Sequence, residues 1–87
     1  ASTAKKIKDL TTFSGEVGLF ELSKQLKKGA VGTNFIVVAR VKPKSGLKNT
    51  LVWLANSSGD ITFPEPVKEF RSDDITDAIN QLGYKLV

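Results

Sequence analysis

The side chains that could do chemistry in this sequence are carboxylates, hydroxyls and lysines, because histidine and cysteine are both absent. Without them the chain cannot form a Ser-His-Asp triad, a Cys-His pair or a zinc site with its usual ligands. The Gly-x-x-x-x-Gly-Lys-Ser/Thr pattern of a phosphate-binding loop is also missing. Composition allows a Ser–Lys dyad, but no motif marks one. We therefore expect no enzyme activity and no cofactor.

Two groups of carboxylates remain as candidates. Asp73, Asp74 and Asp77 cluster at an expected helix start, where their oxygens could hold a metal ion. A solvated helix start explains them without a metal, because the helix dipole favours anions there. Glu65 and Glu69 could form a glycosidase pair, but an 87-residue chain leaves little room for the cleft that this chemistry needs. We expect neither a metal site nor a catalytic pair.

The basic side chains are more informative. Thirteen Lys and Arg against nine Asp and Glu give a net charge of +4. Residues 1–48 carry a balance of +7, whereas residues 49–87 carry −3. A positive surface attracts nucleic acid or an acidic protein, and a molecule with one basic and one acidic face can pack head to tail on its own copies. The alternative is that the lysines only keep a small protein soluble.

The types of these side chains limit what they could recognise. Eleven of the thirteen cations are lysines, whereas specific base reading favours arginine. Any nucleic-acid binding should therefore have low sequence specificity, and whether DNA or RNA is bound stays open. The candidate contacts to a partner or to nucleic acid are basic side chains and two aromatic ones: Lys5, Lys6, Lys8, Lys24, Lys27, Lys28, Arg40, Lys42, Lys44, Phe63 and Phe70.

The elements that must position these residues include two clear strands. Alternation predicts a strand over 35–42, and its first half is apolar on both faces, so we expect that end to be covered twice. A second strand is predicted over 50–55, with Trp53 either in the core or serving as a stacking platform for bases. A short strand over 61–63 should return antiparallel to it, because about five turn residues join the two.

The N-terminal part is harder to interpret. Residues 1–6 are predicted to form a flexible basic arm. Residues 19–28 fit a helix, because Leu19, Leu22 and Leu26 share one helical face. The same segment also alternates, and nearby glycines disfavour a helix start, so a strand over 17–23 is slightly favoured.

Residues 72–83 carry the strongest helix signal. Ser72 is a suitable N-cap, and Ile75, Ala78, Ile79 and Leu82 form one apolar stripe. Gly83 suits the left-handed position after the last turn, and Tyr84 should fold back onto Ile79. The sequence therefore predicts a single α+β domain over 1–87. It would consist of a small antiparallel sheet of three or four strands, a C-terminal helix, and a second helix if 19–28 is helical.

Membrane insertion and secretion by a signal peptide are not expected. The fully apolar run 35–39 is five residues long, and no run in the sequence is longer, whereas a spanning helix needs roughly 20 residues. The basic start Lys5-Lys6-Ile7-Lys8 is not followed by the apolar segment of a signal peptide.

Four segments together carry a resemblance to a known group of proteins. They are Leu19-Phe20-Glu21-Leu22-Ser23, Asn34-Phe35-Ile36-Val37-Val38-Ala39, the stretch from Asn49 through Trp53-Leu54-Ala55-Asn56 to Gly59-Asp60, and Ile75 to Ala78 followed by Leu82-Gly83-Tyr84. In this the chain resembles a group of short proteins of unknown function encoded by tailed bacteriophages. It departs from their pattern after the Gly turn, where Phe63-Pro64 stands in place of an expected Trp.

The resemblance implies a phage setting and no activity or site residues. We therefore expect a non-enzymatic interaction protein, a phage structural or virion-accessory component of the decoration or cement type. It would dock on a protein partner, other virion subunits or copies of itself, in the virion or the host cytoplasm. The alternative is a small basic nucleic-acid-binding protein of low sequence specificity.

Overall fold

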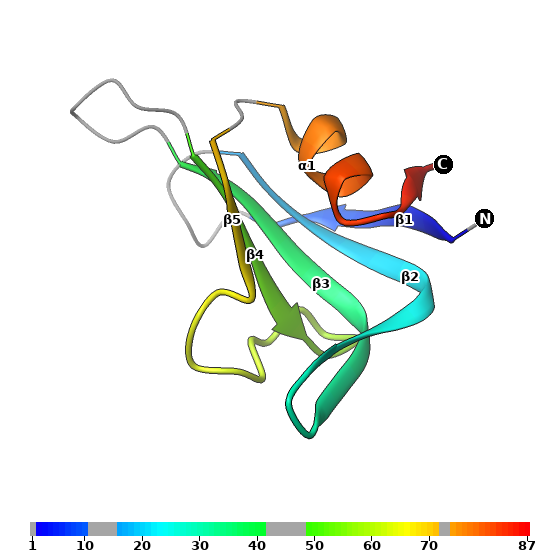
Figure 1. Cartoon of the computed structure of the whole chain (residues 1–87), viewed down its shortest axis with the longest axis vertical. Coiled ribbons are helices and arrows are strands. Elements are labelled where there is room, and N and C mark those ends of the chain that lie inside the picture. Colours follow the sequence, from blue (N-terminus) through cyan, green and yellow to red (C-terminus); the bar gives the residue numbers. More distant parts are fainter. Residues whose placement is uncertain (1, 11–15, 42–48, 72–73) are drawn as a thin grey trace.

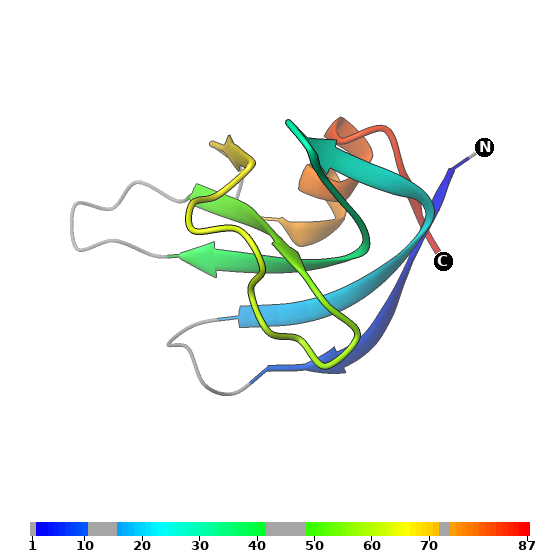
Figure 2. The same cartoon turned by 90° about the horizontal axis from the view of Figure 1, so that it is seen from below.

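A single curled sheet of six strands makes up most of the molecule. The computed structural model describes residues 2–10, 16–41, 49–71 and 74–87. The strand order is β5-β4-β3-β2-β1-β6, in which neighbours are antiparallel except for the parallel pair of β1 and β6. The sheet curls into a half-barrel, and the two chain ends lie near each other beside β1 (Figures 1 and 2). The elements are β1 (Thr3–Asp9), β2 (Glu16–Lys28), β3 (Val31–Val41), β4 (Asn49–Ala55), β5 (Lys68–Phe70), α1 (Ile75–Gln81) and β6 (Lys85–Leu86).

Strand β3 lies in the interior of the sheet and is covered on both sides. Ile36 and Val38 belong to one buried cluster, whereas Val37 and Ala39 belong to a second cluster on the opposite face. The sequence of a strand that is buried on both faces is a continuous apolar run, without alternating polar residues. The prediction of double coverage from the apolar start of this strand is therefore confirmed.

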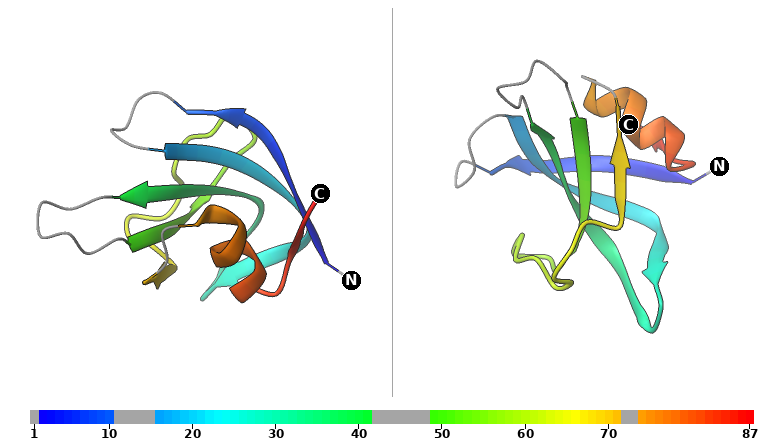
Figure 3. Two further views of the ribbon diagram at one scale, coloured as in Figure 1. Left: turned by 90° about the horizontal axis from the view of Figure 1, so that it is seen from above. Right: turned by 60° about the vertical axis from the view of Figure 1, so that its left-hand side comes forward.

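We call the side of the sheet that α1 covers the helix face (Figure 3). Asp74 caps the helix by accepting a hydrogen bond from the Thr76 amide at 3.0 Å. Ala78 and Ile79 are fully buried, and the Tyr84 amide donates to the Ile79 carbonyl at 3.2 Å. Gly83 supplies the left-handed turn with φ 95°. The predicted stripe and the left-handed Gly83 after the last turn are confirmed, but the helix covers only Ile75–Gln81, and its N-cap is Asp74 rather than the predicted Ser72. Residues 72–73 lie outside the described part.

The opposite side, which we call the loop face, is partly covered by the 56–60 turn that follows β4 (Figure 2). Val17, Leu19 and other buried residues form its cluster, and Trp53 packs against them while staying partly exposed. Gly59 has φ 90°, and a Cβ there would lie 3.3 Å from Leu10 Cδ2 and 3.6 Å from Leu19 Cδ2. Glycine therefore allows the 56–60 turn to close tightly over this cluster.

The predicted fold class is wrong: the protein is mostly β, with six strands and one short helix among the described residues. The strand favoured over 17–23 is confirmed, and the alternative helix over 19–28 is wrong, because this whole segment belongs to β2. Leu19 is buried on the loop face and Leu22 on the helix face, so the leucines that share a helical face in the sequence serve opposite faces of a strand. Tertiary burial here overrides a local helical spacing.

The other differences concern short or polar strands. Residues 3–6 of the predicted arm are paired within β1, where only Ala4 is buried. The return after β4 reaches the sheet through one bridge, Ile61 to Ala55, and β5 then adds residues 68–70. Because the side chains of these segments are mostly exposed, their sequences lack the apolar alternation from which a strand can be predicted. Within the described residues, no helix is long and apolar enough to span a membrane.

Candidate nucleic-acid interface

The β2–β3 hairpin extends beyond the rest of the sheet. We call its outer part, residues 24–33, the cationic hairpin. Lys28 pairs with Val31, and the two residues between them form the turn, with φ 61° at Gly29. Glycine at the first central position is typical of a type II′ turn, whose twist matches that of the flanking strands. The turn lies at the end of the molecule away from α1 and from both chain ends (Figure 1).

The cationic hairpin leaves the sheet at an irregularity in β2. The regular register stops at Glu21 opposite Phe35 and resumes at Leu26 opposite Thr33, so β2 carries extra residues. Such a bulge bends a strand and increases its twist. It separates the part of β2 that pairs with β1 from the part that forms the hairpin.

Side-chain hydrogen bonds anchor the base of the hairpin. The Tyr84 hydroxyl donates to the Lys24 carbonyl at 2.8 Å, and Asn34 Nδ2 donates to the Leu22 carbonyl at 3.0 Å. Thr33 Oγ1 donates to the Ala55 carbonyl at 2.7 Å. Burial raises the pKa of Tyr84 above its ordinary value of 10.0, so its hydroxyl keeps its proton at neutral pH. The hairpin is therefore held by hydrogen bonds to Tyr84, which follows α1, and to β4.

Apolar packing adds to this anchoring. Leu26 and Val31 are partly buried and pack against the core of the helix face. Lys27 lies across its cross-strand partner Gly32, since a Cβ there would be only 3.0 Å from Lys27 Cγ. The aliphatic stem of a lysine can cover backbone in this way while its ammonium stays in water.

The charge on this hairpin has one sign. Lys24, Lys27 and Lys28 are all exposed, and no acidic residue occurs between Leu22 and Ala39 in the sequence. None of the three ammonium groups makes an ion pair with the described residues. Three uncompensated cations on an anchored two-stranded ribbon form a surface that attracts polyanions.

The other predicted basic residues do not join this group. Lys5, Lys6 and Lys8 lie on β1, which pairs with residues 18–22 of β2 and not with the hairpin. Lys6 forms an ion pair with Asp9. The structure thus separates the predicted N-terminal cations from the cationic hairpin.

Arg40 and the aromatic candidates are also elsewhere. Arg40 lies near the end of β3 farthest from the turn, and β3 is an interior strand of the sheet. Phe63 and Phe70 are partly buried against the core of the helix face and do not form an exposed aromatic patch. Lys42 and Lys44 lie outside the described residues.

Sequence reasoning missed the contact that orients the hairpin. Tyr84 and Lys24 are separated by 60 positions, and the bond uses a backbone carbonyl that has no residue-type signal. The prediction that Tyr84 folds back onto Ile79 placed the ring in the core but did not reveal where its hydroxyl points.

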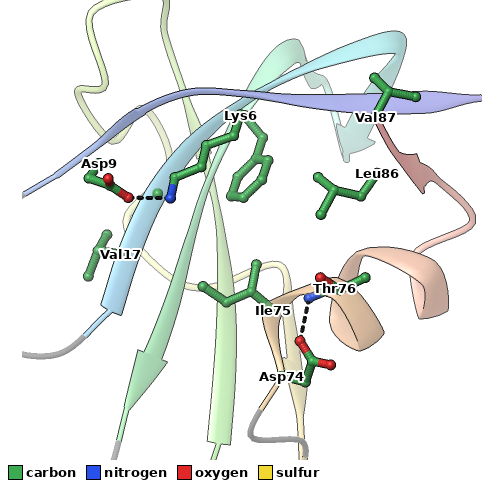
Figure 4. Close-up of a pocket in the computed structure, with 10 residues that line it drawn as sticks. Lys6, Asp9, Val17, Asp74, Ile75, Thr76, Leu86 and Val87 are labelled. Carbon is green, nitrogen blue, oxygen red and sulfur yellow. Dashed lines mark hydrogen bonds and ion pairs between the residues drawn. The ribbon is translucent and has the colours of Figure 1, made fainter.

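A separate pocket of about 250 Å³ lies on the helix face between β1, β2 and the start of α1 (Figure 4). Its three charged side chains are engaged with each other or with backbone. Asp9 pairs with Lys6, and Asp74 accepts from the Thr76 amide. Gly18 makes room for the ring of Phe20, which a Cβ would approach to 2.9 Å. The pocket contains none of the hairpin lysines, and the described residues contain no group of three His, Cys, Asp or Glu that could hold a metal ion.

Comparisons of the chain with protein-family models, with curated proteins and with solved structures find no match. The resemblance to short phage proteins therefore stays a prediction, and the function must be argued from the surface itself.

Proposed function

We propose that this protein is a non-enzymatic binding protein whose cationic hairpin binds the phosphate backbone of nucleic acid with little sequence preference. The observation that carries the proposal is the gathering of Lys24, Lys27 and Lys28 on one anchored ribbon without an acidic partner among the described residues. Of the candidate cations named from the sequence, these lie on the cationic hairpin, with Lys24 at its base and Lys27 and Lys28 next to its turn.

The chemistry of lysine fits this role. Its ammonium is a compact point charge that contacts phosphate but does not read base edges in the bidentate manner of arginine. Each phosphate neutralised by a lysine releases condensed counterions, so affinity falls as salt concentration rises. Phosphate contacts position a protein on nucleic acid without specifying a sequence.

A salt titration tests the proposal. Fluorescence anisotropy with a labelled DNA should give a slope of log affinity against log salt of about −3 if the three lysines each contact a phosphate. The variant K24Q/K27Q/K28Q should lose most binding and most of this slope. No binding by the wild type at about 50 mM salt would reject the proposal.

A matched control variant distinguishes the effect of where the lysines lie from the effect of net charge on DNA binding. The variant K5Q/K8Q/K68Q removes the same number of exposed lysines from β1 and β5. It should retain nearly the wild-type slope, because those residues lie outside the cationic hairpin. If both variants lose affinity equally, binding reflects only overall charge and the hairpin has no special role.

A virion-accessory role through protein docking is the second candidate. The resemblance implies it, and the two exposed large apolar side chains among the described residues, Ile7 (46%) and Val87 (67%), lie on β1 and directly after β6. Strand β6 forms a two-residue sheet edge, to which a partner strand could add. Mass spectrometry of purified particles would support this role by finding the protein at fixed stoichiometry. A location in virion or host cytoplasm is a prediction of the same kind.

A further inference from the structure

The geometry of the cationic hairpin points to double-stranded DNA in the B-form as its ligand, with the tip of the hairpin entering the major groove. This inference rests on the proposed function and adds the class of nucleic acid. Three features of the hairpin support the inference. They are its narrow width, its lack of aromatic side chains for base stacking, and the placement of its lysines.

The width of the hairpin matches this groove. From Leu26 to the turn, β2 pairs only with β3, and β3 begins to pair with β4 only at Phe35. The tip is thus a two-stranded ribbon, and the major groove of B-DNA, about 12 Å wide, admits such a ribbon. Gly29, Ala30 and Gly32 are exposed and small, so the tip is narrow.

The hairpin offers no platform for single-stranded bases. Binding of single strands relies on aromatic side chains on which successive bases stack. No aromatic residue occurs between Leu22 and Asn34. The nearby Phe35 and Trp53 are partly buried against the cluster of the loop face. A single strand would therefore meet charge here but no stacking surface.

Duplex RNA fits less well than duplex DNA. The major groove of A-form RNA is deep and narrow, and side chains cannot read it. Its shallow minor groove is recognised through hydroxyl and phosphate contacts across a wide surface, which a narrow projecting ribbon does not provide.

The placement of the lysines suits a groove bordered by two phosphate backbones. Lys27 and Lys28 are consecutive strand residues, and successive side chains of a strand leave opposite faces. Lys28 shares its face with Leu26 and Val31, whereas Lys27 lies on the opposite face beside Gly32, so the two ammonium groups leave opposite faces of the ribbon. Lys24 is at the base of the ribbon, where Tyr84 fixes its carbonyl.

Direct comparison of ligands tests the inference. Anisotropy should be measured with a DNA duplex, an RNA duplex and single-stranded DNA of matched sequence, in one buffer of about 50 mM salt. The DNA duplex should bind at least about tenfold more tightly than either alternative. The major-groove ligand methyl green should displace the protein, whereas the minor-groove ligand netropsin should not.

The outcomes separate this inference from the proposed function. Equal or tighter binding of single-stranded DNA or duplex RNA, or displacement by netropsin alone, would overturn the groove inference while leaving phosphate binding in place. No binding to any of the three ligands would reject both.

A substitution at the tip provides a second test. Ala30 is exposed, and no described non-glycine residue has positive φ, so Ala30→Trp places a bulky aromatic group at the tip without straining the turn. It should weaken duplex DNA binding several-fold by obstructing the groove, while single-stranded DNA binding is kept or strengthened through stacking. The matched variant Ala30→Ser should behave as wild type. Unchanged duplex affinity in Ala30→Trp, with the fold intact by circular dichroism, would contradict entry of the tip into a groove.

Discussion

The two parts of β2 use the same backbone conformation for opposite purposes. Residues 17–22 lie within the sheet, and all of them except Glu21 are buried, on alternating faces. Residues 23–28 comprise most of the irregular stretch and the hairpin strand that follows it, and only Leu26 among them is partly buried. One strand thus contributes both to the scaffold and to the candidate binding surface.

This difference shows how a chain of this size can keep a stable core and an exposed ligand surface in one element. The scaffold part gains its stability from burial on both faces, which tolerates few changes. The hairpin part depends on a small number of anchoring contacts, so its exposed positions are free to carry charge. Substitutions in the first part should therefore change stability, whereas those in the second part should change binding.

The largest effect is expected from truncation in the scaffold part. Phe20→Ala removes a ring that is 2% exposed in the core of the helix face. We expect the free energy of unfolding to fall by about 3–5 kcal/mol, because a cavity replaces the buried ring. Urea denaturation followed by circular dichroism measures this loss. Gln25→Ala, an exposed change in the other part of β2, is the control and should cost less than about 0.5 kcal/mol. Similar losses of stability in Phe20→Ala and Gln25→Ala would contradict the division of β2 into a scaffold part and a hairpin part.

A smaller effect is expected at the contact that joins the two parts. Tyr84→Phe keeps the ring in the core but removes the hydrogen bond to the Lys24 carbonyl. We expect a loss of about 1 kcal/mol in stability. We also expect a several-fold loss of DNA affinity with an unchanged salt slope, because the lysines are all present on a less well-fixed hairpin. Unchanged affinity would show that hairpin orientation does not matter for binding.

The smallest effect should appear only at alkaline pH. Burial raises the pKa of Tyr84 in the folded state above its unfolded value near 10.0. The unfolded chain therefore loses this proton first, and the associated stability is present below pH 10 and is lost as pH rises through the folded pKa. Thermal unfolding of wild type and Tyr84→Phe between about pH 8 and pH 11 should show a steeper decline for the wild type. Parallel declines would show that Tyr84 does not carry this dependence.

Sequence patterns identified the elements whose side chains are buried. The apolar start of β3 and the stripe of α1 were visible because burial selects residue types at fixed spacings. Strand β1 was not visible, since Ala4 is its only buried residue and its stability comes from backbone pairing on both sides. Strand β5, with three residues and no buried side chain, is a similar case.

The candidate interface was only partly predictable for a related reason. Lys24, Lys27 and Lys28 were among the named candidates, but so were cations on β1 and β3 that the fold places elsewhere. Which lysines gather depends on strand register and on the irregularity after Glu21, and neither follows from local composition. The anchoring bond from Tyr84 joins residues 60 positions apart and leaves no local signal.

Residue-by-residue mapping of DNA binding tests the central claim most directly. Amide nitrogen–proton correlation spectra of the labelled protein should be recorded during titration with a short DNA duplex at low salt. Our account predicts that the largest shifts fall on residues 24–33, with small changes on the scaffold part of β2. Shifts concentrated on β1 or on the loop face, with the hairpin signals unmoved, would contradict it.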